Sequence, residues 1–480
     1  MPANPNNTIP ENISHIHLMA ICGTGMGALA ALLKDEGFRV TGSDQNVYPP
    51  MSTFLSEKGI EVSQGFDPDR ILKEKPDLVI VGNAIRRENP EAEALFTGNI
   101  PYCSMPQALN HFLVGKRKAI VIAGTHGKTT TSALMAWVLE CAGLSPGFMI
   151  GGILKNFSAN TRMGHGPYVV LEGDEYDTAF FDKGSKFLHF RPHRALLTGI
   201  EFDHADIFKD LAHVESAFEG FIRRIPEDGL LIASRDSDSV HKLLKDTGFA
   251  QDRLVFFGKE KGSSWSASDP EIHELTETFS IFHDGNFFGR FESRIPGEHN
   301  RMNILAVCAT AASLGISAED IAPAIASFSG VKRRQELRGT VNGISVVDDF
   351  AHHPTAVLET LKAMKPHAKG RLIAVFEPRT NTSMRKVFQE AYAQSFGLAD
   401  LVCIREVPMP EKVPPEERFS VPALVKNLKE QGLSAEDFKD AGEIIAFLKK
   451  EARPQDLILI MSNGGFENIH ERLLEALGKR

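Results

Sequence analysis

Short apolar runs alternate along the chain with stretches in which apolar residues recur every three or four positions. The first run covers residues 16–21, and the helical pattern after it ends at Gly37, a residue that commonly stops a helix. The same order of strand and helix returns after Lys116 and again after Gly330. Alternation of this kind predicts parallel sheets that carry helices on their faces.

The apolar runs fall into three groups, which predict an α/β chain of three domains. We expect a Rossmann-like domain at residues 1–115, a central P-loop ATPase-type domain at residues 116–329 and a second Rossmann-like domain at residues 330–480. Residues 258–289 are expected to be β-rich, with a hairpin turn at His283-Asp284-Gly285-Asn286. Strands are expected at residues 78–81, 118–123, 168–171, 195–198, 229–233, 344–347, 372–376, 401–404 and 457–461.

The composition is typical of a soluble globular protein. Hydrophobic residues make up 42% of the 480 positions and charged residues 24%, and no apolar run reaches the roughly eighteen residues that would span a membrane. A formal charge of −9 argues against a general affinity for nucleic acid or anionic membranes. The five cysteines are scattered and the first residues do not resemble a signal peptide, so we predict a cytoplasmic protein.

The strongest local signal is the loop Gly124-Thr125-His126-Gly127-Lys128-Thr129-Thr130, between a predicted strand and a predicted helix. A helix N-terminus offers unpaired N–H groups, glycines let the backbone approach phosphate oxygens, and lysine adds a mobile charge. A neighbouring hydroxyl can bind Mg²⁺. Ile122 stands where the general P-loop pattern has glycine. We predict a triphosphate site; the alternative is an ordinary strand-to-helix turn with a surface lysine.

A second glycine-rich turn, Gly23-x-Gly25-x-x-Ala28, follows the first predicted strand, and Asp44 stands about twenty residues further on. This spacing fits the dinucleotide fingerprint, but any diphosphate nucleotide gains from the same turn. The turn therefore predicts a site for a nucleotide whose identity stays open. A nicotinamide-dependent oxidoreductase and a purely structural turn are the alternatives.

Two acidic loops follow predicted strands of the central domain, at residues 172–177 and 201–206. Ligands bind at the carboxyl edge of strands in open α/β sheets, and oxygen ligands placed there suit Mg²⁺. We single out Glu172 and His204 as metal ligands. Solvated acidic loops and a structural histidine are the alternatives.

Taken in order, these segments resemble the Mur ligase family, the enzymes that build UDP-muramoyl peptides for bacterial cell walls. The resemblance covers nearly the whole chain. It rests on residues 124–130, 172–175, 203–204, 297–303, 332–334 and 348–354. It implies an ATP-dependent amide ligase with ATP and Mg²⁺ as cofactors, small-molecule substrates, and a monomer or weak homodimer. The first domain would bind a UDP-sugar, the central domain ATP, and the third both ATP and a peptide.

Two branches of the family share the His-Gly-Lys loop and the His-His-Pro triplet. One adds L-alanine to UDP-N-acetylmuramate, and the other adds the recycled tripeptide L-Ala-γ-D-Glu-meso-diaminopimelate. Segments at residues 42–52, 81–84, 376–382 and 461–466 are similar to the tripeptide branch, whereas Glu467-Asn468 departs from its glycine-rich pair. The resemblance thus favours the tripeptide, with L-alanine addition as the nearest alternative and an inactive nucleotide-binding module as another.

The resemblance also implies a role for each matching residue. ATP would be held by Gly124, Thr125, His126, Gly127, Lys128, Thr129, Thr130, Asn300, Asn303, Arg334 and Asp349. The UDP-sugar would contact Gly23, Thr24, Gly25, Met26, Gly27, Ser43, Asp44 and Asn83, and Arg379 would contact a peptide carboxylate. Thr129, Glu172 and His204 would bind metal, and Lys128, His204, Arg334 and His352 are the candidate catalytic residues. The helix expected at residues 214–224 has no lysine, so we predict no carbamylated lysine.

Overall fold

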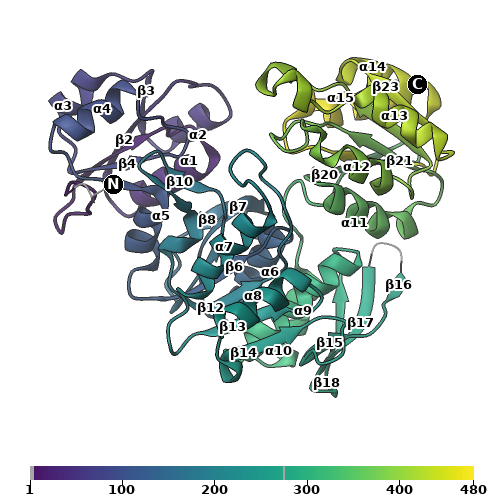
Figure 1. The fold of residues 1–480 in the computed structure, drawn as a ribbon, viewed down its shortest axis with the longest axis horizontal. Coiled ribbons are helices and arrows are strands. Elements are labelled where there is room, and N and C mark those ends of the chain that lie inside the picture. The colour runs from purple at the N-terminus through teal and green to yellow at the C-terminus, as the bar shows by residue number, and fades with distance from the viewer. Residues whose placement is uncertain (1–4, 274–275, 480) are drawn as a thin grey trace.

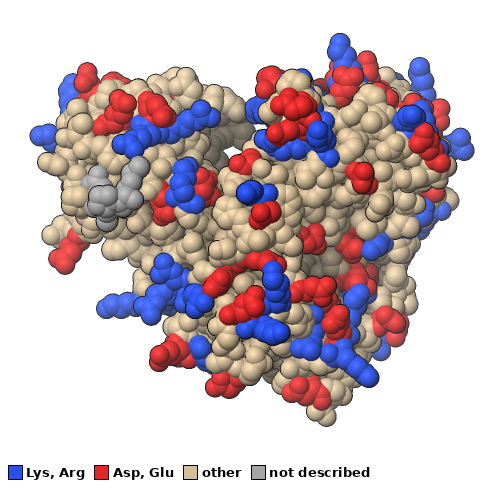
Figure 2. All heavy atoms as spheres, in the orientation of Figure 1, with Lys and Arg blue, Asp and Glu red and all other residues tan. Residues whose placement is uncertain are grey.

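The computed structural model describes residues 5–273 and 276–479. Three α/β lobes, each with its own sheet, follow one another along the chain (Figure 1), which confirms the predicted three-domain α/β organisation. On the face shown in Figure 2, a notch separates the N-terminal lobe from the C-terminal lobe. The boundaries near residues 115 and 329 stay a prediction. No helix in the described ranges is long and apolar enough to cross a bilayer.

The N-terminal lobe contains a parallel sheet in the order β3-β2-β1-β4-β5, the order expected of a Rossmann-like domain. Strand β1 (His15–Met19) is buried throughout, and the chain turns from its carboxyl end into α1 (Thr24–Asp35). This places the glycine-rich turn at the edge of the sheet where ligands bind. The other elements are β2 (Arg39–Asp44), α2 (Met51–Glu57), β3 (Glu61–Gln64), α3 (Pro68–Glu74), β4 (Leu78–Val81), α4 (Pro90–Thr97), β5 (Tyr102–Ser104), α5 (Met105–Ala108) and a π-helix (Leu109–Val114).

The central lobe is built on an 11-stranded sheet in which β6 (Lys118–Ala123) lies between β9 (Tyr168–Glu172) and β12 (Pro192–Leu197). Successive residues of β6 enter different cores, Val121 on one face and Ile122 on the other. Because both faces are covered, the strand is a continuous apolar run in the sequence. The helices are α6 (Lys128–Cys141), α7 (Leu211–Ile222), α8 (Asp238–Thr247), α9 (Glu298–Ala312) and α10 (Ala318–Ser327).

The β-rich character of the second half of this lobe is confirmed, but its strands are not a separate decoration. They extend the edge of the central sheet beyond β14 (Leu254–Phe257). The predicted hairpin joins β17 (Thr276–His283) to β18 (Asn286–Ser293), and its turn residues Asp284 and Gly285 have φ of 48° and 78°. The remaining strands of the lobe are β7 (Gly147–Leu154), β8 (Ala159–Arg162), β10 (Asp177–Ala179), β11 (Asp182–Ser185), β13 (Leu230–Ser234), β14 (Leu254–Phe257), β15 (Trp265–Ala267) and β16 (Glu271–His273).

The C-terminal lobe has a sheet in the order β19-β20-β24-β21-β22-β23, parallel except for β19. Its strands β21 (Leu372–Phe376) and β24 (Leu457–Met461) have the predicted bounds, because each is a wholly buried apolar run. The other elements are β19 (Glu336–Val341), β20 (Ile344–Asp349), α11 (Pro354–Met364), α12 (Gln389–Ser395), β22 (Leu401–Arg405), α13 (Val421–Glu430), β23 (Ala435–Phe438), α14 (Ala441–Glu451) and α15 (Ile469–Gly478).

The segment before α15 explains the departure from the family pattern noted in the sequence. Phe466, Glu467 and Asn468 have φ of 43°, 51° and 57°, three consecutive residues in the left-handed region. Glycine adopts this conformation without strain, whereas for a residue with a Cβ the conformation costs about 1–2 kcal/mol of free energy. A glycine-rich pair would therefore suit this backbone, and Glu467-Asn468 adopts it with strain.

Replacing Asn468 with glycine is expected to leave the free energy of unfolding of the C-terminal lobe unchanged or to raise it by up to about 1 kcal/mol. Asn468→Ala should lower it by about 1 kcal/mol, because alanine tolerates positive φ less well than asparagine. Urea denaturation monitored on the full chain measures both. The matched control is Asn427→Gly inside α13, where right-handed backbone predicts a loss of about 1 kcal/mol. Equal losses at both positions would contradict the strain.

Candidate functional site

The predicted phosphate loop connects β6 to α6 and leaves the N-terminus of that helix open. Gly124 and Gly127 have φ of 131° and 80°, so both need the freedom of glycine. A Cβ on Gly124 would lie 2.2 Å from the Thr198 hydroxyl, and one on Gly127 would lie 2.6 Å from Asn303 Oδ1. Backbone N–H groups at this helix start face the space that a phosphate would take. The loop has the geometry that an anion requires.

Lys128 is the first residue of α6 and folds back over the loop. Its Nζ donates to the carbonyl oxygens of Gly124 and Thr125 at 2.6 and 3.2 Å and to Glu175 Oε1 at 2.9 Å. Burial opposes the charge, yet Glu175 with the acidic residues around it raises the pKa of Lys128 above its ordinary value. The lysine is therefore a permanent cation beside the helix start, where phosphate oxygens would replace the carbonyls as its partners.

Thr129, Glu172 and Arg334 form a second contact at the loop. Thr129 Oγ1 donates to Glu172 Oε1 at 3.0 Å and accepts from Arg334 Nη2 at 3.2 Å, while the Gly151 N–H donates to Glu172 Oε2 at 2.8 Å. A hydroxyl and a carboxylate so placed are oxygen donors of the kind that Mg²⁺ prefers. The residues present therefore fit a magnesium ion between Thr129 and Glu172.

His204 was predicted to bind a metal ion together with Glu172, but its contacts in the structure are with Glu175 and Asp203. Its Nε2 lies 3.3 Å from Glu175 Oε1, and its backbone N–H donates to Asp203 Oδ1 at 2.6 Å. Burial disfavours its charge, but Glu175 and Asp203 together raise the pKa of His204. Within the described ranges, His204 is not part of a compact three-residue metal cluster with Glu172, and its role as a ligand stays a prediction.

The two predicted adenine contacts lie beside the phosphate loop on α9. Asn300 donates to the Pro296 carbonyl at 2.9 Å and to Gln335 Oε1 at 3.0 Å, and it accepts from Asn303 at 3.2 Å. Both asparagines are buried, and Asn303 packs against Gly127. The helix thus brings amide groups to the loop, as a purine site requires, although their amides are at present engaged with one another.

The C-terminal lobe reaches the loop through Arg334 and the residues after β20. The Arg334 guanidinium lies 4.4 Å from the centre of the Phe350 ring, which orients it towards Thr129. Asp349 is buried and accepts from the N–H groups of Gln335 and Ala351, both at 2.8 Å. Asp349 therefore holds the linker that carries Arg334, and a direct contact with nucleotide stays a prediction.

The other predicted residues of this lobe are His352 and Arg379. The Nδ1 of His352 lies 3.0 Å from the Phe350 carbonyl, and burial lowers the pKa of its ring despite the nearby Asp203. Arg379 follows β21, packs over Gly464, and its Nη1 lies 3.9 Å from Glu377 Oε1. About a third of the Arg379 side chain stays exposed at 37%, which leaves it free to meet an anion.

A cavity of about 1230 Å³ opens at the glycine-rich turn of the N-terminal lobe. Its walls come from two lobes. The residues that line it include Gly23, Thr24, Gly25, Met26, Asp44 and Asn83 from the N-terminal lobe and Glu172, Asp174 and Lys186 from the central lobe. The carboxylate of Glu172 therefore faces this cavity and also bonds to Thr129 of the phosphate loop.

Two residues predicted to contact a sugar nucleotide do not line this cavity. Ser43 is fully buried and its hydroxyl donates to Glu91 Oε2 at 2.5 Å. Gly27 faces Met51, since a Cβ at this position would lie 2.5 Å from the Met51 sulfur. In this structure Ser43 satisfies the buried Glu91 and Gly27 lets α1 pack closely against Met51, and a contact of either residue with a sugar nucleotide stays a prediction.

The sequence did not single out three residues that the structure places at the site. Glu175 pairs with Lys128 and His204, Glu201 lies 3.4 Å from His126, and Thr355 donates to Glu201 at 2.7 Å. Glu175 and Glu201 do lie in the two acidic loops after strands, which was the available signal. The sequence did not indicate which residues they would pair with, because those partners come from distant segments.

Family models match almost all of the chain in three parts. They are the Mur ligase family catalytic domain at residues 15–117, the Mur ligase middle domain at residues 122–311 and the Mur ligase glutamate ligase domain at residues 333–464. The chain is also 42% identical to UDP-N-acetylmuramate–L-alanyl-γ-D-glutamyl-meso-2,6-diaminoheptandioate ligase of Haemophilus influenzae, over 97% of this chain and 99% of that relative. The similarity thus spans all three lobes.

Two crystal structures have the same three-lobed fold. A murein peptide ligase from Psychrobacter arcticus matches with 36% identity and a TM-score of 0.69, over 98% of this chain and 99% of that one. The UDP-N-acetylmuramate-alanine ligase from Thermotoga maritima matches with 25% identity and a TM-score of 0.76, over 96% and 98%. The TM-score and the identity rank the two differently. The overall superposition of a three-lobed chain depends on how its lobes are oriented as well as on their folds.

Three segments that carry the sequence resemblance meet at this site: Glu172 bonds to Thr129 of the phosphate loop and lines the first cavity, and Arg334 of the third lobe bonds to Thr129. Family models cover residues 15–117, 122–311 and 333–464, so little of the chain falls outside the match. The chain belongs to the Mur ligase family.

Proposed function

We propose that this protein is an ATP-dependent amide ligase that joins the tripeptide L-Ala-γ-D-Glu-meso-diaminopimelate to UDP-N-acetylmuramate in cytoplasmic peptidoglycan recycling. The observation that supports it most is the position of Glu172. This carboxylate lines the cavity at the glycine-rich turn and also accepts from Thr129 of the phosphate loop at 3.0 Å. A sugar nucleotide in the first site and ATP in the second would therefore meet at Glu172.

In the proposed reaction, the carboxylate of UDP-N-acetylmuramate attacks the γ-phosphorus of ATP and ADP leaves, which gives an acyl phosphate. Phosphoryl transfer needs little covalent help, so positioning and charge neutralisation dominate. Lys128 and Arg334 are the cations within reach of the loop, one from the helix start and one from the C-terminal lobe. Because they belong to different lobes, both act together only when the third lobe rests on the loop.

The magnesium ion that the family implies would be held by Thr129 and Glu172, and His204 stays a further candidate. Their oxygen atoms, 3.0 Å apart, suit a hard cation that shares its remaining sites with phosphate oxygens and water. When bound, the ion would supply charge neutralisation at the transferring phosphoryl group. Glu172 also accepts from the Gly151 N–H, which fixes its orientation before any ligand arrives.

In the second step the α-amine of the tripeptide attacks the acyl carbon, and phosphate leaves from the tetrahedral intermediate. An α-amine has an ordinary pKa near 8, so a general base would need to give only modest help in removing its proton. Burial lowers the pKa of His352, which keeps its ring neutral and able to accept a proton at neutral pH. Arg379, after β21, would contact a peptide carboxylate through its two-pronged guanidinium.

Of the two alternative functions, the addition of L-alanine has more support than a nicotinamide-dependent oxidation. The higher TM-score of the Thermotoga maritima alanine ligase favours L-alanine addition as the second candidate. A nicotinamide-dependent oxidoreductase has no need of a triphosphate loop, so that alternative does not account for the loop or for its Lys128–Glu175 pair. We further propose that the enzyme acts as a monomer or weak homodimer on small-molecule substrates.

A paired-substrate assay tests the assignment. With ATP, Mg²⁺ and UDP-N-acetylmuramate present, the tripeptide is expected to support phosphate release at least about tenfold faster than the same concentration of free L-alanine. Phosphate release without any amine is the control. Turnover with free L-alanine alone would show that the second candidate is right, and turnover with neither would contradict the ligase assignment.

A further inference from the structure

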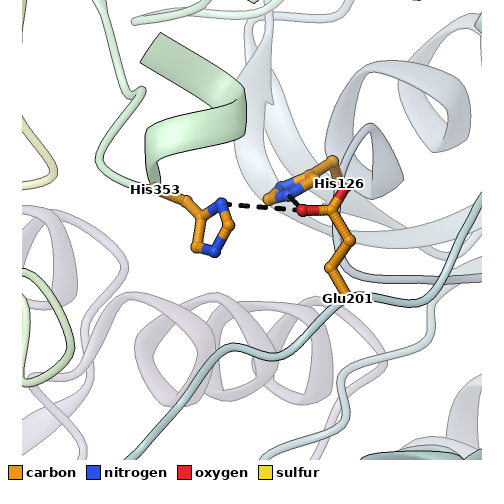
Figure 3. Close-up of side chains that lie close together, drawn as sticks. All are labelled: His126, Glu201 and His353. Carbon is orange, nitrogen blue, oxygen red and sulfur yellow. Dashed lines mark ion pairs between the residues drawn. The ribbon is translucent and has the colours of Figure 1, made fainter. Parts of the chain in front are cut away.

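Three side chains from separate segments meet beside the phosphate loop, away from Thr129 and Glu172. They are His126 of the loop, Glu201 after β12 and His353 at the start of α11 (Figure 3). His126 Nε2 lies 3.4 Å from Glu201 Oε2, and His353 Nδ1 lies 3.9 Å from the same oxygen. The potential ligand atoms all lie within 4.8 Å of one another. Two imidazoles and one carboxylate are a common ligand set for Zn²⁺.

The contacts around the cluster orient these donors as ligands. His353 is buried, and its Nε2 lies 3.2 Å from the Phe202 carbonyl, to which it would donate. That bond leaves the lone pair of Nδ1 on the side of Glu201. Metal-binding histidines are commonly fixed in this way, by a hydrogen bond from the other ring nitrogen to a backbone carbonyl. Thr355 Oγ1 fixes Glu201 by donating to Oε2 at 2.7 Å.

Two features of the cluster bear on how readily a cation would enter. His126 Nε2 has no hydrogen-bond partner among the described residues, although it faces Glu201. The Thr355 N–H donates to His353 Nδ1 at 3.3 Å, a long bond that a cation would displace. Two ligand atoms of one tetrahedral Zn²⁺ lie about 3.3 Å apart. The two distances to Glu201, 3.4 and 3.9 Å, would therefore have to shorten by less than about 1 Å, and atoms separated by as much as 4.8 Å would have to move about 1.5 Å closer.

For two of the three side chains, His353 and Glu201, protons compete little with a cation at neutral pH. Burial and the nearby His126 lower the pKa of His353 to about 4. Burial would raise the pKa of Glu201, but the neighbouring imidazoles and the hydrogen bond from Thr355 outweigh it and lower that pKa to about 2. Metal ligands must be deprotonated to bind, and these two are.

We propose that His126, Glu201 and His353 form a binding site for a transition-metal cation such as Zn²⁺, separate from the oxygen site for Mg²⁺. Imidazole donors select Zn²⁺ over Mg²⁺, which prefers oxygen. Because His353 belongs to the C-terminal lobe and His126 to the phosphate loop, a bound cation would fasten the third lobe to the loop. This binding goes beyond the proposed reaction and does not depend on it.

Cobalt titration of the full chain, without nucleotide and in excess Mg²⁺, tests the site. A Cys141→Ser background removes the exposed cysteine as a competing ligand. One equivalent of Co²⁺ is expected to give the visible absorption of a four-coordinate ion, and Zn²⁺ is expected to displace it. Glu201→Gln and His126→Gln should each weaken Co²⁺ binding by about 10–100-fold or more. Two variants are used so that a folding defect in one does not decide the result.

The matched control is His189→Gln, which removes another histidine–carboxylate pair of the central lobe, 2.7 Å from Asp182. It should bind Co²⁺ as the parent does. Thermal unfolding gives a second readout, because a ligand that binds only the folded state raises Tm. Zn²⁺ should raise Tm in the parent and in His189→Gln but not in Glu201→Gln. Absence of the cobalt band, or equal binding by parent and Glu201→Gln, would overturn the proposal.

Discussion

Replacing Lys128 with alanine is expected to lower the rate of ATP-dependent phosphate release by about 10²–10³-fold. Lys128 is a preorganised cation at the start of α6, anchored by the carbonyls of Gly124 and Thr125. Without it, charge that develops on the transferring phosphoryl group loses a fixed counter-charge in a site shielded from water. Steady-state phosphate release at saturating substrates measures the loss.

The same substitution removes the partner of Glu175, which is only 3% exposed. We expect the free energy of unfolding to fall by about 1–3 kcal/mol, and not more, because His204 remains 3.3 Å from that carboxylate. The double variant Lys128→Ala/Glu175→Gln removes the stranded charge. It should recover stability without recovering the rate, which separates the catalytic loss from the structural one.

Lys183→Ala is the matched control, since it removes an exposed lysine that pairs with Asp177 at 2.7 Å in the same lobe. Exposed pairs contribute little, about 0–1 kcal/mol, so neither stability nor rate should change much. Phosphate release by Lys128→Ala within a few-fold of the parent would contradict the role of the loop. It would then favour a different triphosphate site.

Replacing Arg405 with leucine is expected to lower the free energy of unfolding of the C-terminal lobe by about 3–5 kcal/mol. Arg405 forms an ion pair with Glu377, a carboxylate that is fully buried and also accepts from Ser462 Oγ at 2.5 Å. Arg379 is too distant, at 3.9 Å, to satisfy Glu377 in its place. A buried charge that loses its partner keeps the full cost of desolvation. Chemical denaturation of the full chain measures the change.

The double variant Glu377→Gln/Arg405→Leu should recover a large part of that loss, because it removes both charges together. Arg290→Leu is the matched control. Its pair with Glu271 lies at the surface with both side chains more than half exposed, so about 0–1 kcal/mol is expected. Similar losses in Arg405→Leu and Arg290→Leu would show that Glu377 finds another partner or admits water.

The strands could be predicted because a strand that is buried on both faces of a parallel sheet consists of consecutive apolar residues. Strands β4, β6, β21 and β24 have the bounds that these runs indicate. The phosphate loop was equally visible, since glycines, lysine and hydroxyls must follow one another directly to surround an anion. The left-handed backbone at Glu467-Asn468 was not predicted and became apparent only in the structure.

The site between the lobes was less predictable, because its contacts join residues far apart in the chain. Glu175 meets Lys128 across 47 positions, and Arg334 meets Thr129 across 205. Contacts between residues so far apart produce no regular spacing in the sequence from which they could be predicted. The same holds for Ser43, for which the family resemblance implied a ligand contact, and whose hydroxyl the fold directs to Glu91, 48 positions away.

The sequence by itself determined most elements of this protein, the order of its lobes and the glycine-rich loop between β6 and α6, because local spacing encodes burial, helix starts and tight turns. Only the tertiary structure decided which charges face one another: Lys128 with Glu175, and His126 with Glu201 and His353. Electrostatic partners are set by distances of a few ångströms between folded segments, and the chain acquires those distances only when its lobes pack together.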